Sequence, residues 1–145
     1  MSVGRHHRLH EGVPSALVLA AALWLGACGG QSDPERERQT LASWGAAVGM
    51  ASEQWSNGAV PGHFLHDLLQ SAQNAFEEER QATLQITSRA ARAELLAALD
   101  SLQHDAAVLQ QQLARGDTGS ARHEAALVSR IAVGLGESSQ KTGAQ

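Results

Sequence analysis

Four side chains of types that bind metal ions fall at two places in the sequence. His63, His66 and Asp67 lie within five residues of one another, and His123 lies much further along, beside Glu124. On a helix the first three would share about one turn, and such groups bind zinc or copper in helical bundles. His123 can join them only if the intervening chain reverses direction. The more ordinary interpretation, which we favour, is that these are exposed or capping residues near helix starts and that they bind no metal.

Motifs typical of enzymes are absent from the sequence. It has no Gly-x-Ser-x-Gly, no glycine-rich phosphate loop and no His-Glu-x-x-His, and its single cysteine is Cys28. A formal net charge of -4 excludes a strongly basic nucleic-acid binder. We therefore expect neither an enzyme nor a nucleic-acid partner.

The first residues have the pattern of an export signal. Arg5 and Arg8 precede an apolar run from Val13 to Leu25. This run is shorter than the ~20 residues that cross a bilayer as a helix, and no charged stop-transfer segment follows it. The pattern predicts a signal peptide rather than a permanent membrane span.

The end of this run carries a more specific motif. Leu25, Gly26 and Ala27 precede Cys28, and this tetrapeptide resembles the lipobox of bacterial lipoproteins. The resemblance, which covers only the first 28 residues or so, implies that the Cys28 thiol receives diacylglycerol and that cleavage makes Cys28 the first residue. In that family the new amino group is often acylated too. Two or more acyl chains anchor a protein stably to a membrane.

An alternative stays open, in which an ordinary secretory signal is cleaved nearby and Cys28 stands there by chance. If Cys28 is lipidated, Gly29 bears on the destination of the protein. In Gram-negative lipoproteins an Asp at this position commonly signals retention in the inner membrane. The resemblance therefore favours the outer membrane if the host has one.

Helical periodicity predicts that most of the rest of the chain is helical. A polar tether is followed by Ser32 or Asp33 as an N-cap before Pro34. The next segment places its apolar residues at steps of three and four and ends at Asn57-Gly58, after which Pro61 suits the first turn of a second helix. The residues of this first apolar stripe are Leu41, Trp44, Val48, Ala51 and Trp55.

The segment between Gly62 and Gly116 contains neither glycine nor proline and holds two apolar stripes that are out of phase. The first is Leu65, Leu69, Ala72 and Phe76, and the second is Leu95, Leu99, Leu102, Ala106, Leu109 and Leu113. Either one bent helix covers the segment or a tight turn at Thr87-Ser88 divides it. We favour the turn, because one long helix would expose a polar middle. We interpret its Glu77-Glu78-Glu79 run as a solvated face.

A last helix begins near Gly116, with Asp117 or Ser120 as its N-cap, and should fray between Gly134 and Gly136. Its apolar side contains Ala121, Val128, Ile131 and Leu135. The predicted fold is all-α, a small antiparallel bundle of three to four helices. The predicted divisions are a signal peptide (1–27), a lipidated cysteine and flexible tether (28–34), the helical domain (35–137) and a polar tail (138–145).

These features predict a lipid-anchored, extracytoplasmic protein of the cell envelope with a structural or protein–protein interaction role. Its partners would be the membrane, through the lipid on Cys28, and another envelope protein. Apolar residues left exposed after the bundle closes would mark the partner surface. The alternative is a periplasmic metal-binding or metal-sensing module that uses His63, His66, Asp67 and His123.

Overall fold

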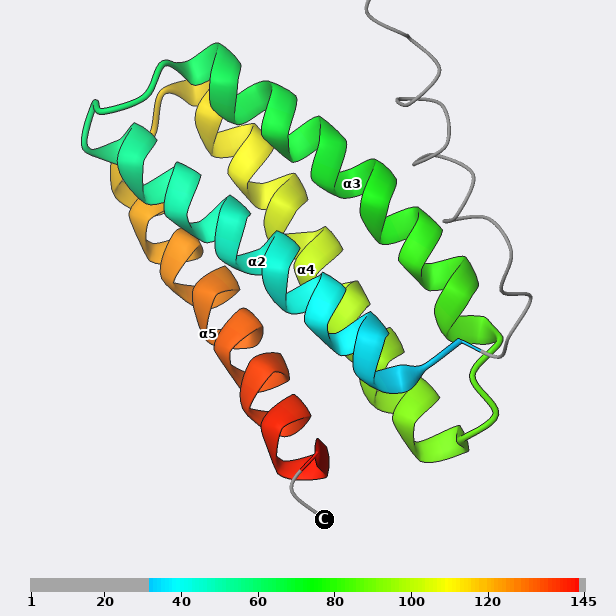
Figure 1. The fold of residues 1–145 in the computed structure, drawn as a ribbon. Coiled ribbons are helices and arrows are strands. Elements are labelled where there is room, and N and C mark those ends of the chain that lie inside the picture. Colours follow the sequence, from blue (N-terminus) through cyan, green and yellow to red (C-terminus); the bar gives the residue numbers. More distant parts are fainter. Residues whose placement is uncertain (1–31, 144–145) are drawn as a thin grey trace, which may run out of the picture. The chain divides into compact units, whose positions relative to one another are not determined.

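The computed structural model describes residues 32–143, with side chains as far as Ser138. This part of the chain folds into four helices and no strand: α2 (Pro34–Ser56), α3 (Gly62–Leu84), α4 (Arg89–Arg115) and α5 (Thr118–Gly143). Short connections make consecutive helices antiparallel (Figure 1). The predicted all-α bundle is confirmed, with four helices.

Apart from the end of α5, the helices begin and end close to where the sequence predicts. Asp33 caps α2, because its side-chain oxygen accepts a hydrogen bond from the Glu35 amide at 3.0 Å, and Pro34 lies in the first turn. Asp117 caps α5 and accepts a bond from the Ser120 amide at 3.0 Å. Gly116 adopts the left-handed conformation, with a φ of 67°, that ends α4.

The segment between Gly62 and Gly116 is divided into two helices, so the predicted turn is confirmed. α3 ends at Leu84 and α4 begins at Arg89 after its N-cap, Ser88. Between them the Ile86 side chain is buried, and the Arg92 guanidinium donates a hydrogen bond to the Ile86 carbonyl at 3.2 Å. Packing and capping therefore stabilise this turn without a glycine or a proline.

Apolar side chains from all four helices meet in one core. The predicted stripes supply it, except that Trp44, Trp55, Leu113 and Ile131 are only half-buried against it. The predicted stripe residues that are buried are Leu41, Val48, Ala51, Leu65, Leu69, Ala72, Phe76, Leu95, Leu99, Leu102, Ala106, Leu109, Ala121, Val128 and Leu135. Burial of these side chains is the main favourable contribution to folding.

α2 and α5 pack most closely, because glycine faces small residues between them. A Cβ added to Gly49 would collide with the Ser129 hydroxyl and come within 3.2 Å of the Ala125 carbonyl oxygen. One added to Gly45 would lie 3.0 Å from the Ala132 Cβ. The other packed pairs are α2 with α3, α3 with α4, α4 with α5, and α2 with α4 across the centre.

The prediction that the last helix frays between Gly134 and Gly136 is wrong. α5 continues through Gly134 and Gly136 to Gly143 instead of fraying there. Leu135 is buried between these glycines, and the Ser138 hydroxyl donates a hydrogen bond to the Gly134 carbonyl at 2.9 Å. Packing and this bond offset the helix-weakening effect of glycine, which is about 1 kcal/mol per residue.

Candidate functional site

The histidines considered as metal ligands do not assemble into a site. His63, His66 and Asp67 are exposed near the start of α3, and His123 is exposed near the start of α5. Both starts lie at the same end of the bundle, as the turn requires, but α3 and α5 occupy opposite corners and do not touch within the described residues. Among residues 32–143, no three His, Cys, Asp or Glu side chains are grouped closely enough to hold a metal ion.

The lipobox residues Leu25, Gly26, Ala27 and Cys28 lie outside the described residues. Their role therefore remains an expectation from the sequence. Within residues 32–143, none of the helices is both long enough and apolar enough to span a bilayer.

One carboxyl pair joins α2 to α3. Glu37 is buried, and Glu79 faces it from the last turns of α3. Burial, a hydrogen bond with Glu37 and the charge of Glu37 raise the pKa of Glu79 to about 8, and Arg36 opposes that rise. Near neutral pH the pair therefore holds a proton. The interpretation of Glu77-Glu78-Glu79 as a solvated face is right for the first two residues, which are exposed, and wrong for Glu79.

A second carboxyl pair joins α4 to α5. Asp105 and Glu124 are both buried, at 8% and 9% exposure. Burial raises the pKa of Glu124, and the charge of Asp105 and a hydrogen bond with it raise it further, against the pull of His104 and His123. Each of the two carboxyl pairs thus lies between two helices.

Ion pairs and hydrogen bonds fix the register of the helices around these carboxyl pairs. The Arg38 guanidinium on α2 donates two hydrogen bonds, at 3.0 and 3.3 Å, to the Glu94 carboxylate on α4. The hydrogen bond to Glu94 is the main reason why the pKa of Arg38 rises. Arg122 on α5 donates a 2.8 Å bond to the Asn57 side chain where α2 ends. These contacts hold the surface of α2 in place.

Among the described residues, the surface around α2 carries three of the four large exposed apolar side chains. Met50 on α2, Phe64 on α3 and Val133 on α5 are 60%, 49% and 59% exposed. Ala46 and Ala47 are exposed beside Met50. We call these five residues the α2 face. In the described part of the chain, the only other large apolar side chain classed as exposed is Leu84, where α3 ends.

Two shallow hollows flank Met50 on this face. One lies between α2 and α5, and Ala42, Ala46, Met50, Ala132 and Val133 line most of it. The other lies between α2 and α3, where Phe64 and Leu68 form its far wall. Alternating hollows and projecting side chains are the shape into which another helix packs.

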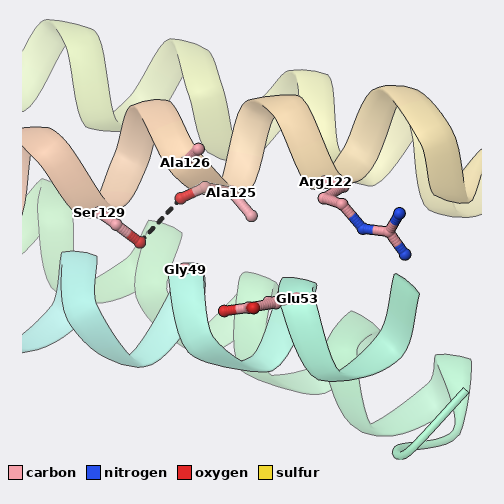
Figure 2. Close-up of a pocket in the computed structure, with 6 residues that line it drawn as sticks. All are labelled: Gly49, Glu53, Arg122, Ala125, Ala126 and Ser129. Atoms are coloured by element: carbon pink, nitrogen blue, oxygen red, sulfur yellow. Dashed lines mark hydrogen bonds between the residues drawn. The ribbon is translucent and has the colours of Figure 1, made fainter. Parts of the chain in front are cut away.

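A third hollow continues the seam between α2 and α5 towards the end where α5 begins. Figure 2 shows Gly49 and Glu53 of α2 on one side of it and Arg122, Ala125 and Ser129 of α5 on the other. The Ser129 hydroxyl donates to the Ala125 carbonyl at 2.8 Å, so it is already satisfied inside α5. The hollow is therefore lined by small residues and has charge at its rim.

The sequence contains patterns from which some of these features could have been predicted. Continuing the stripe from Phe76 by steps of three and four leads to Glu79, Thr83 and Ile86, and the last two are fully buried. Met50 lies outside the stripe that Leu41 begins, so its exposure follows from helical phase. The contributions of Phe64 and Val133 depend on which helices become neighbours.

Comparison with protein-family models, with curated proteins and with solved structures gives no match to this chain. What the protein does must be inferred from its own residues.

Proposed function

We propose that this protein is a lipid-anchored structural or adaptor protein of the bacterial cell envelope. Cys28 carries the lipid, and the helical bundle binds a protein partner through the α2 face. The single observation that supports binding is that the exposed side chains of Phe64 and Val133 line the two hollows that flank the exposed Met50. Contiguous apolar surface rimmed by polar groups marks interaction sites on water-soluble domains.

The position of the anchor fits this role. Cys28 stands six residues before Pro34, and an extended tether of that length reaches roughly 20 Å. The bundle would therefore remain close to the membrane while its sides stay accessible. Charged groups on the rim, such as Glu53, would orient a partner more than they strengthen its binding.

Photo-crosslinking in living cells tests the binding role. A photoreactive amino acid at Met50 should give a discrete crosslinked protein product, whereas the same substitution at Glu77, exposed on α3, should not. Replacing Val133 with Glu in the Met50-labelled chain should reduce the product several-fold, because a charge then occupies the edge of the contact. Equal products from positions 50 and 77, or none from position 50, would contradict the proposed binding surface.

A further inference from the structure

The outward stripe of α2 extends beyond the α2 face and has charge at each end. Arg36, Ser43, Ala47, Met50 and Gln54 follow one another at steps of seven, four, three and four, and all five are exposed. Glu53 adjoins the far end of this stripe and is exposed as well. A basic end, a small apolar middle and an acidic end therefore follow one another along one helix.

Neither end charge forms an ion pair with another described residue of the bundle. Within the described residues, the ion pairs involve Arg38 with Glu35 and Glu94, and Arg80 with Asp100, but neither Arg36 nor Glu53. Arg36 lowers the pKa of Glu79 electrostatically but forms no ion pair with it. Both charges are thus available to a molecule that binds along α2.

The charges along α2 are complementary to those of a second α2 that runs in the opposite direction. If two α2 helices lie antiparallel with their centres between Trp44 and Gly45, Arg36 of each chain meets Glu53 of the other. Small side chains at Ala46 and Ala47 then allow close approach. Met50 of each chain lies opposite position 39 of the other, beside the hollow that is lined by Arg36, Gln39, Thr40, Ser43 and Trp44. A parallel pair would instead place like charges together at both ends, which is unfavourable.

We propose that the partner of the α2 face is a second copy of this chain, bound antiparallel along α2. This inference rests on the proposed binding role of that face. The interface is isologous, so each contact occurs twice, as in most homodimers. The two tethers leave at opposite ends of the pair, and both can reach one bilayer if the bundles lie lengthwise along it.

Sedimentation of the fragment from Gly29 onward tests the proposal. The fragment contains the whole Gln31–Gln145 unit, which is compact and has its own core. We expect a concentration-dependent dimer. Arg36→Glu and Glu53→Arg should each weaken it at least about tenfold, because two attractive pairs become repulsive. The double variant should restore it, and Glu77→Arg, on a distant face of α3, should leave it unchanged.

Circular dichroism should show that every variant is folded, since all three changed positions are exposed. Two results would overturn the inference: a monomer even at about 1 mM, or a dimer that the charge exchange fails to restore. The crosslinking experiment separates this failure from that of the proposed function. A product from Met50 that contains a different envelope protein would preserve the binding role and exclude the second copy.

Discussion

At the scale of single residues, the least expected feature is the presence of two carboxyl pairs between helices. Glu37 meets Glu79, and Asp105 meets Glu124, and burial is the main cause of each raised pKa. Composition could not reveal this, since glutamate is most often exposed on a helix. Helical phase could, because Glu79 continues the apolar stripe through Phe76 whereas Glu78 does not.

The Glu79 carboxyl should make the stability of the bundle depend on pH. Its pKa rises from 4.5 to about 8 on folding, so between these values the folded chain holds a proton that the unfolded chain has lost. The free energy of unfolding should therefore fall as pH rises through that window and level off above about pH 8. Glu79→Gln should flatten this dependence and stabilise the fold by about 1 to 2 kcal/mol at pH 8, since water screens part of the pair.

Urea unfolding of the fragment from pH 5 to 9 measures this effect. Glu78→Gln is the matched control, because Glu78 is exposed next to Glu79, and it should keep the dependence of the native sequence. An unchanged slope in Glu79→Gln would mean that the proton is held elsewhere.

At the scale of helices, local chemistry predicted most boundaries. Asp33 and Asp117 are caps that were among the candidates predicted from the sequence. At Ser88 the sequence predicts only a turn, and the structure shows that Ser88 caps α4 without a glycine or proline there. The end of α5 was not predictable in this way. Gly134 and Gly136 weaken a helix, and the burial of Leu135 together with the hydrogen bond from the Ser138 hydroxyl to the Gly134 carbonyl offsets this effect.

Alanine at position 134 and alanine at position 49 should change the stability of the fragment in opposite directions. Gly134 has open space where a Cβ would lie, so Gly134→Ala should stabilise the fragment by about 0.5 to 1 kcal/mol. Gly49→Ala should leave it at least about 1 kcal/mol less stable than Gly134→Ala, because the new Cβ meets Ser129 and the Ala125 carbonyl. Thermal and urea unfolding measure both.

Removing the Ser129 hydroxyl should recover part of the loss. In the double variant Gly49→Ala/Ser129→Ala only the Ala125 carbonyl still crowds the added methyl, so the two effects should not be additive. Purely additive effects would show that α2 and α5 do not pack as closely at this point as described.

At the scale of the whole molecule, the sequence predicts the fold better than the site. Periodicity indicates which side of each helix is buried, and the turn near Ser88 makes four antiparallel helices. It does not indicate that α3 and α5 take opposite corners, which keeps His123 away from His63, His66 and Asp67. For the same reason, periodicity could not predict that Phe64 and Val133 lie near Met50.

The most direct measurement of the central proposal is the intact mass of the protein purified from membranes of cells that produce the full chain. The account predicts a polypeptide that begins at Cys28 and carries diacylglycerol, together with palmitate incorporation that Cys28→Ser abolishes. A polypeptide that keeps residues 1–27, or one cleaved elsewhere and free of acyl mass, would contradict it.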